Sequence, residues 1–497
     1  MTNCILSIDQ GTSSTKAIVF DDKGKALNKA SEPLKTNYLP GNLVEQDPED
    51  IYRNVLSAVG KCIRGFVDSG GDAERIRACG ISNQRETFVL WDRNGKPLYN
   101  AVVWLCKRSV ELCKRLKDKG WEETVKNKTG LIIDPYFSGT KVLRLYETDE
   151  KVRNAIDAGE AFIGTVDAWL LFRLTKGEKY MTDYTNASRT MFFNIREMKW
   201  DRELLEMFGL PKLNLPETRP SAFEYGSTDF EGILKAPIGI CSMIGDSHAA
   251  AFGEGLYSPG VAKATLGTGC SVMMNIGREI KSSGRGMVPT ICWSAPGRTD
   301  YAMEGIVVAC GATIEWLKNE LGLFRSNDEI EKMNAAVEDN NGVYLVPAFS
   351  GLGAPHWDMS RLASITGLSF DCNRNHVVRA ALESIPYQIK DVIGAMEEDS
   401  GIRLRELQVD GGITSNRFVL QFLADLLERP VVNIGIADVS ALGAAYLAGL
   451  QCGVYKDLEQ IAAFGQDKAT IYPGEDAVKV RKYYQGWLNA IGAGRAK

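Results

Sequence analysis

The chain has 497 residues, of which 44% are apolar and 24% are charged. This composition supports a sizeable buried core and excludes global disorder, and at roughly 100–200 residues per domain the length predicts two or three domains. The formal net charge of −5, without a basic tract, argues against nucleic acid or an anionic membrane as the main partner.

The cysteines and the apolar runs are typical of a soluble, cytoplasmic protein. Eleven cysteines are scattered from Cys4 to Cys452 without a CxxC pair, which predicts reduced thiols and not a disulfide framework. Only three histidines are present, which argues against a His-rich metal site. No apolar run approaches the about 18 residues of a membrane span. Asp9 and Gln10 directly follow the first apolar stretch, which is not the pattern of a signal peptide. We therefore expect a soluble, cytoplasmic protein without membrane insertion.

The first segment predicts two strands around a tight turn. ILSI and KAIVF are short and rich in branched residues, and a turn of glycine, threonine and serine separates them. A proline and acidic residues from Asp47 precede a 3.6-residue apolar pattern, which predicts a helix start. Residues 76–104 predict strand, polar loop, strand, turn and strand, and residues 110–161 are mostly helical.

Residues 261–277, VAKATLGTGCSVMMNIG, partly repeat the pattern of the opening hairpin. Such self-similarity over about 250 residues suggests duplicated domains. The alternative stays open, because any large α/β protein contains several strand–turn–strand units. A cluster of glycine and proline between 253 and 260 places the boundary, giving an N-terminal domain of 1–253 and a C-terminal domain of 254–497. Further helices are expected at Ala309–Leu321, His376–Glu398, Asn416–Glu428 and Ser440–Leu450.

Three turns could bind phosphate. The turn after the first strand exposes backbone N–H groups and the hydroxyls of Thr12, Ser13 and Ser14, and Asp9 at the strand end is placed to hold Mg²⁺ through water. A plain β-turn capped by the aspartate is the alternative. The turn around Thr268 has the same chemistry, and Gly411-Gly412 lies between a strand and an amphipathic helix. Together these turns point to a nucleotide held between domains.

With these turns, the sequence resembles the FGGY family of carbohydrate kinases, and within it most closely the members that phosphorylate glycerol. The resemblance covers nearly the whole chain. The motifs that show it occur in the same order along the chain as in the family. They are IDQGTSSTKAIVFD, GISNQRET, GKPLYNAVVW, TGLIIDPYFSGTK, TDYTNASRTMFFNI, GTGC, ASITGLSFDCNRNHVVRAALE, VDGGITSN and ALGAAYLAGL.

The resemblance implies an α/β fold of two actin-like (ribonuclease-H-like) domains around a nucleotide and substrate cleft. The cofactors would be ATP and Mg²⁺, with the nucleotide mainly on the second domain and the metal beside Asp9. The residues implied around the nucleotide and its phosphates are Thr12, Ser13, Ser14, Lys16, Thr268, Gly311, Glu315, Gly412 and Asn416.

Asp246 corresponds to the family's catalytic base, since a carboxylate can accept the proton of a poorly nucleophilic alcohol. Its alternative role is an N-cap, because SHAAAF begins a helix well. Arg85 and Glu86 match residues that hold acceptor hydroxyls, and Trp104 and Tyr136 match an aromatic lining that suits the C–H face of a polyol. A surface ion pair for Arg85–Glu86 and ordinary core for Trp104 are the competing interpretations.

Four positions depart from the glycerol-specific pattern. Ser247 replaces a glutamine and is followed by His248, and Ser271 replaces a phenylalanine. Both serines stand at acceptor-lining positions, so we hypothesise a larger, more hydroxylated acceptor, although glycerol remains a candidate. Lys16 replaces an arginine and Glu315 a glutamine on the nucleotide side.

The expected function is ATP-dependent phosphorylation of a terminal hydroxyl of a polyol, giving glycerol 3-phosphate from glycerol. The alternative acceptor is a four- or five-carbon polyol or ketose such as erythritol, xylitol or xylulose. An actin- or chaperone-like ATPase and a regulatory protein without catalysis are competing classes, and the matched acceptor residues and aspartates argue against both. The family implies a homodimer or homotetramer.

Overall fold

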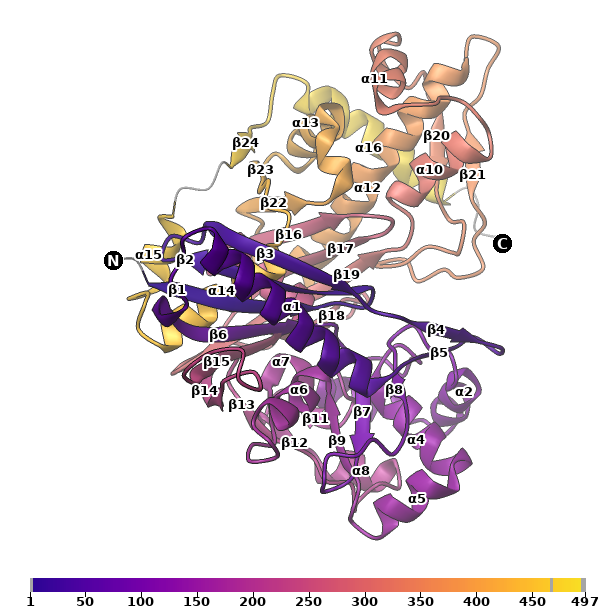
Figure 1. Ribbon diagram of the computed structural model, residues 1–497. Coiled ribbons are helices and arrows are strands. Elements are labelled where there is room, and N and C mark those ends of the chain that lie inside the picture. The colour runs from indigo at the N-terminus through magenta and orange to yellow at the C-terminus, as the bar shows by residue number, and fades with distance from the viewer. Residues whose placement is uncertain (1–2, 465–467, 493–497) are drawn as a thin grey trace. The chain divides into compact units, whose positions relative to one another are not determined.

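The computed structural model describes residues 3–464 and 468–492 (Figure 1). The chain forms two compact units. Unit 1 consists of Met1–Gly255, Thr290–Tyr301 and Asp438–Phe464, and unit 2 of Leu256–Pro289, Ala302–Ala437 and Gly465–Lys497. Among the described residues, no helix is both long and apolar enough to cross a membrane. All eleven cysteines carry free thiols, as expected.

A six-stranded sheet organises unit 1, in the order β14-β15-β6-β1-β2-β3. β1 is antiparallel to β2 and parallel to β6. The strands are β1 (Cys4–Gln10), β2 (Ser14–Asp21), β3 (Ala26–Pro33), β6 (Ile76–Asn83), β14 (Ala222–Thr228) and β15 (Ile238–Gly245). β1 and β6 are buried along nearly their whole length, as expected for strands covered on both faces.

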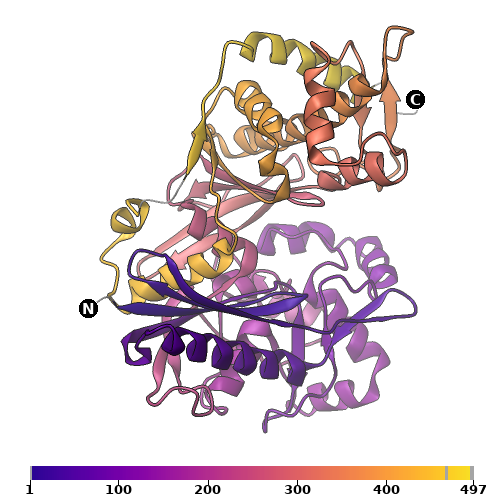
Figure 2. The same cartoon turned by 45° about the horizontal axis from the view of Figure 1, so that its top comes forward.

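Helices cover the two faces of this sheet. Leu6 and Ile8 of β1 point into the core formed with α1 (Pro48–Asp68). The intervening Ser7 donates its hydroxyl to the carbonyl of Ala441 in α14 (Val439–Gln451), on the other face. In Figure 2, α1 (indigo) and α14 (yellow) accordingly flank the indigo strands. α1 begins after Asp47, whose side chain accepts from the Glu49 amide, so the predicted helix start is confirmed.

The remainder of unit 1 carries a second sheet, ordered β4-β5-β8-β7-β9, and short helices. The strands are β4 (Asn37–Leu39), β5 (Leu43–Gln46), β7 (Phe88–Trp91), β8 (Ala101–Val102) and β9 (Phe162–Thr165), with the pairs β10 (Met181–Asp183)/β13 (Glu217–Arg219) and β11 (Phe193–Asn194)/β12 (Lys199–Trp200). The helices are α2 (Val110–Asp118), α3 (Glu122–Thr129), α4 (Ser138–Thr148), α5 (Glu150–Asp157), α6 (Val166–Leu174), α7 (Tyr184–Ala187), α8 (Arg202–Met207), α9 (Asp246–Glu254) and α15 (Leu458–Ala462), with the 3₁₀ turn η1 (Ala73–Arg75).

A seven-stranded sheet has the order β18-β19-β17-β16-β22-β23-β24. Most of its strands lie in unit 2, whereas Thr290–Tyr301, which includes most of β18 and the start of β19, belongs to unit 1. The strands are β16 (Val261–Leu266), β17 (Cys270–Gly277), β18 (Val288–Ala295), β19 (Arg298–Val307), β22 (Glu406–Asp410), β23 (Val431–Asn433) and β24 (Ala469–Ile471), with the separate pair β20 (Tyr344–Val346)/β21 (Ser364–Thr366). The helices are α10 (Gly311–Asn319), α11 (Asn327–Ala335), α12 (Arg374–Ser400), α13 (Arg417–Leu427) and α16 (Ala477–Gly492), with the 3₁₀ turn η2 (Gly412–Ser415).

The partial sequence repeat corresponds to a repeated strand arrangement. β16 is antiparallel to β17 and parallel to β22, as β1 is to β2 and β6. The predicted hairpins at both positions are therefore confirmed. The four predicted later helices are confirmed as α10, α12, α13 and α14.

Candidate active site

The turn between β1 and β2 carries the first group of predicted residues. The Gly11 amide donates to the carbonyl of Ser14 at 2.9 Å and closes the turn. Ser13 is exposed and Thr12 is half-buried. Thr12 Oγ1 accepts from Trp104 Nε1 at 2.9 Å and donates to Gln84 Oε1 at 3.3 Å. The turn therefore presents hydroxyls, and one of them is tied directly to the predicted aromatic lining.

Asp9 lies near the end of β1, before this turn. Ser82 Oγ donates to Asp9 Oδ1 at 3.0 Å. Burial raises the pKa of Asp9 to about 6, and the neighbouring carboxylate of Asp246 adds to the shift. A divalent cation would favour the ionised form of such a carboxylate. Among the described residues no group of three or more acidic, cysteine or histidine side chains could hold a metal ion. An ion at Asp9 would thus take further ligands from phosphate and water.

Lys16 lies opposite Asp9 in the β1–β2 pairing. Its Nζ binds Asp438 Oδ1 at 3.0 Å, and Lys29 Nζ binds Asp438 Oδ2 at 2.6 Å. Burial alone would raise the pKa of Asp438, but the two ammonium groups hold it below its usual range. Burial likewise opposes the charge of Lys16, and Asp438 outweighs it and raises the lysine pKa. Lys16 therefore remains a cation beside the turn.

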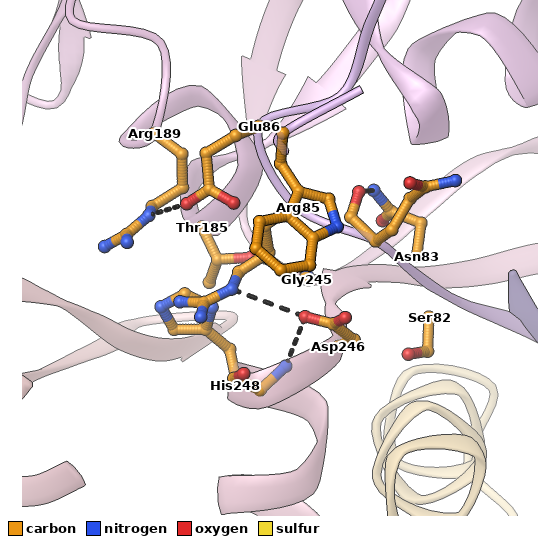
Figure 3. Close-up of polar contacts among 12 residues, drawn as sticks. Ser82, Asn83, Arg85, Glu86, Thr185, Arg189, Gly245, Asp246 and His248 are labelled. Atoms are coloured by element: carbon orange, nitrogen blue, oxygen red, sulfur yellow. Dashed lines mark hydrogen bonds and ion pairs between the residues drawn. The ribbon is translucent and has the colours of Figure 1, made fainter. Parts of the chain in front are cut away.

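Glu86 occupies the polar loop between β6 and β7 in a strained conformation. Its φ of 60° is uncommon for a residue other than glycine and costs on the order of 1–3 kcal/mol. Ser138 Oγ donates to the Glu86 carbonyl at 2.8 Å, and Arg189 Nε donates to Glu86 Oε1 at 2.6 Å. The side chains of Glu86 and Arg189 are 1% and 2% exposed, and Figure 3 shows the carboxylate directed at Arg189.

Arg85, the neighbour of Glu86, has a different partner. Its Nε lies 3.3 Å from Asp246 Oδ1, and its side chain is only 7% exposed (Figure 3). The interpretation of Arg85–Glu86 as a surface ion pair is therefore wrong, because both residues are buried and each pairs with another residue.

Asp246 is the first residue of α9, and Gly245 is the N-cap. The N-cap interpretation of Asp246 is thus wrong by one position. Its Oδ1 accepts from the Ser247 amide at 2.7 Å, and its side chain is 38% exposed and so open to a ligand. The Gly245 amide donates to Thr185 Oγ1 at 3.0 Å, which fixes the start of the helix. The arrangement presents an accessible carboxylate, with an arginine beside it, at a helix N-terminus.

Two aromatic residues stand close to these groups in unit 1. The rings of Trp104 and Tyr136 meet edge to face, with centroids 5.5 Å apart and planes at 65°. Both residues are half-buried, so Trp104 is not ordinary core. Behind them lies Lys141, which is fully buried and donates from Nζ to the carbonyls of Tyr136 at 2.7 Å and Trp104 at 3.4 Å.

Lys141 gives a testable pH dependence of stability. Burial lowers the pKa of its ammonium group from 10.5 to about 7. Between these values the unfolded chain keeps a proton that the folded chain has released, so stability rises with pH. We expect the free energy of unfolding of the wild type to rise relative to that of K141M between pH 7 and about 9.5. Urea denaturation at several pH values measures it, and a difference that stays constant or falls would contradict the expectation.

In unit 2, backbone hydrogen bonds join the GTG turn to the start of α10. The amides of Gly311 and Ala312 donate to the carbonyls of Gly267 and Thr268 at 2.9 and 3.0 Å. A Cβ at Gly311 would lie 2.7 Å from the Gly267 carbonyl oxygen, so this approach requires glycine. The structure therefore brings Thr268 and Gly311, two of the residues implied around the nucleotide, close together.

Gly411 and Gly412 follow β22, next to β16. Gly411 has a φ of 98°, and a Cβ there would lie 2.5 Å from the Leu266 carbonyl oxygen. Gly412 and Asn416 line a cavity of about 60 Å³ together with Ile314, Ile330 and Leu382. Its lining also includes Asn327, Glu331 and Ser415, so the cavity has both apolar and polar side chains.

Three further predicted residues lie on or at the start of the elements that follow these turns. Asn416 is the N-cap of α13, and its Oδ1 accepts from the Val419 amide. Glu315 is exposed on α10 and accepts from Asn319 in the same helix. Ser271 Oγ, on β17, is buried without a hydrogen-bond partner among the described residues.

Sequence reasoning missed Arg189, Lys141, Gln46 and Gln84. Gln84 Nε2 donates to Gln46 Oε1 at 3.0 Å, and Gln46 Nε2 donates to the Thr12 carbonyl at 2.7 Å. All four are buried. Arg189 and Lys141 are basic residues inside the motifs TDYTNASRTMFFNI and TGLIIDPYFSGTK, and their place in these motifs was the available signal.

Comparison with known proteins gives matches over nearly the whole chain. Residues 4–253 match the N-terminal domain, and residues 262–452 the C-terminal domain, of the FGGY family of carbohydrate kinases. A glycerol kinase from Thermoanaerobacter sp. (strain X514) is 44% identical over 493 residues, which cover 99% of this chain and 98% of the relative.

Solved structures match equally fully. Plasmodium falciparum glycerol kinase with ADP has a TM-score of 0.94 and 34% identity, covering 100% of this chain and 99% of that one. A ligand-bound xylulose kinase from Lactobacillus acidophilus has a TM-score of 0.88 at 21% identity, covering 99% and 98% of the two chains. The predicted fold class, α/β with two actin-like domains, is confirmed by these matches.

Proposed function

Because the chain belongs to the FGGY family of carbohydrate kinases, a family of phosphotransferases that act on an alcohol, we propose that it transfers the γ-phosphate of ATP to a terminal hydroxyl of glycerol. The observation that carries the proposal is the accessible Asp246 carboxylate, held by Arg85 at the start of α9. Full-length identity of 44% to a glycerol kinase supports glycerol as the acceptor.

Asp246 serves as the general base in this proposal. As the acceptor oxygen forms its bond to the γ-phosphorus and the bond to the bridging oxygen of ADP breaks, the hydroxyl proton passes to the Asp246 carboxylate. Arg85 and the Ser247 amide both hold Oδ1, which orients the carboxylate.

The acceptor would be bound by polar and aromatic groups of unit 1. Arg85 and Glu86 would meet its hydroxyls, and Trp104 and Tyr136 would pack against its C–H groups. Arg189 holds Glu86 in place for this role. Ser247 and Ser271 would contact the acceptor from the two positions at which the sequence departs from the glycerol-specific pattern.

The nucleotide would be held by the glycine turns. We assign the phosphates to Thr12, Ser13, Ser14 and Lys16 and the rest of the nucleotide to Thr268, Gly311, Glu315, Gly412 and Asn416. Mg²⁺ beside Asp9 would neutralise phosphate charge when bound. In this assignment residues 1–253 form the acceptor domain with the phosphate turn, and residues 254–497 form the adenine nucleotide domain.

A larger acceptor is the second candidate. Ser247 and Ser271 are smaller than the glutamine and phenylalanine of the glycerol-specific pattern. Smaller side chains at acceptor-lining positions would leave room for a four- or five-carbon polyol or ketose, such as erythritol, xylitol or xylulose.

Release of ADP in the presence of Mg·ATP tests the proposal. The acceptors are glycerol, erythritol, threitol, xylitol, ribitol, xylulose and ribulose, with a blank that lacks acceptor. We expect glycerol to give the highest kcat/KM. A longer acceptor that exceeds glycerol by about tenfold would identify the second candidate instead. Equal release in the blank would overturn both and indicate an ATPase.

We further propose a cytoplasmic location and a homodimeric or homotetrameric assembly. The eleven free thiols support a reducing compartment. Light scattering coupled to size-exclusion chromatography would measure the assembly.

A further inference from the structure

Lys141 joins two segments of chain that are distant in sequence. It lies in the first turn of α4, fully buried. Its Nζ donates to the carbonyl of Tyr136, five residues earlier, and to the carbonyl of Trp104, 37 residues earlier. The same two residues carry the rings that meet edge to face. One amino group thus holds the backbone of both members of the aromatic pair.

We propose that Lys141 is a positioning residue for the acceptor, because it fixes the backbones of Trp104 and Tyr136 and thereby the angle of the aromatic wall that receives the acceptor's C–H face. The inference rests on the proposed function of these two rings. In this role Lys141 influences how the aromatic pair binds the acceptor without touching the acceptor itself.

Filling the volume alone would not need a lysine here. Burying an ammonium group is costly, and an apolar side chain of similar length would fill the same volume without that cost. What an apolar side chain lacks is N–H donors. Burial lowers the pKa of Lys141 to about 7, and Glu86 and Cys106 oppose the shift while Lys107 and Arg108 add to it. Even the neutral amine keeps two N–H groups, which is the number that the two carbonyls require.

Edge-to-face packing depends on the position of both rings. A displacement of either backbone would change the ring angle, and a polyol bound against the wall would lose contact area. The loss would affect binding of the acceptor in the ground state and the transition state alike. It should therefore appear in the acceptor KM more than in kcat.

The test compares K141M, which lacks donors, with K141Q, which keeps an NH₂ group on a side chain one atom shorter. K128M is the matched control, because Lys128 is another lysine of unit 1 with hydrogen-bonded partners, Asp201 and Glu203, both at 2.8 Å. Two readouts are used: the KM of the best acceptor and of ATP, and hydrogen–deuterium exchange of peptides covering 101–109 and 133–140. Exchange reports local opening of the backbone that carries Trp104 and Tyr136, independently of activity.

For K141M we expect the acceptor KM to rise about tenfold, with the KM of ATP and kcat within about twofold, and faster exchange in both peptides. K141Q should recover part of the acceptor affinity, and K128M should match the wild type in both readouts. An unchanged acceptor KM in K141M, equal rises of both KM values, or unchanged exchange would each overturn the inference. Wild-type protein without acceptor-dependent ADP release would overturn the proposed function instead, while the exchange data would still judge the positioning role.

Discussion

Replacing Asp246 by asparagine is expected to lower kcat for phosphoryl transfer by about 10³-fold, because the amide has nearly the same shape but cannot accept the acceptor's proton. The carbonyl oxygen of the new amide side chain could still accept from the Ser247 amide, so the start of α9 should remain formed. The KM of ATP should change by less than about threefold, since the loss concerns a group that acts in the transition state. Steady-state ADP release with the best acceptor measures both constants.

D149N is the matched control for this substitution. Asp149 also stands at a helix start in unit 1, where its side chain accepts from the Val152 amide at 2.9 Å. Asparagine caps a helix about as well as aspartate, so D149N should retain full activity and stability. If D246N kept more than about a tenth of the wild-type kcat, Asp246 would not be the general base.

The second large effect is expected for R189M. Removal of the guanidinium would leave the Glu86 carboxylate buried without its 2.6 Å partner, and such a change typically costs about 3–5 kcal/mol of stability. Urea denaturation of the variant and the wild type at pH 7 measures the difference. The double variant E86Q/R189M should regain part of the loss, because a neutral amide is less costly to bury than an unpaired carboxylate.

An exposed ion pair of the same unit provides the comparison for R189M. Arg202 and Glu206 form a helical pair at 2.9 Å with side chains 89% and 55% exposed. R202M should therefore cost less than about 1 kcal/mol. A similar small loss in R189M, or a double variant less stable than R189M alone, would contradict the role assigned to the buried pair.

Local pattern was sufficient for several elements, whereas most of the candidate site came from the family resemblance. The glycine and hydroxyl residues between ILSI and KAIVF produce the β1–β2 turn, and the proline after Asp47 produces the start of α1. Each of these features depends on neighbours in sequence. The N-cap of α9 was misplaced by one residue, because glycine and aspartate are both accepted at helix starts and only the backbone conformation distinguishes Gly245 from Asp246.

The partners of the buried charged side chains could be identified only from the tertiary structure. Glu86 and Arg189 are 103 residues apart, and Lys141 reaches the carbonyl of Trp104 across 37 residues. An ion pair between Arg85 and Glu86 was the competing interpretation from the sequence, whereas in the structure Arg85 pairs with Asp246.

The sequence by itself thus determined the two similar hairpins, the start of α1 and four later helices, and through the family resemblance it nominated the candidate base, phosphate turns and aromatic lining. Only the tertiary structure decided which side chains hold them in place. The physical reason is range: turns and helix starts are set by φ/ψ preferences and hydrogen bonds within a few residues, whereas a buried charge must be satisfied by whichever group the packed chain places within about 3 Å.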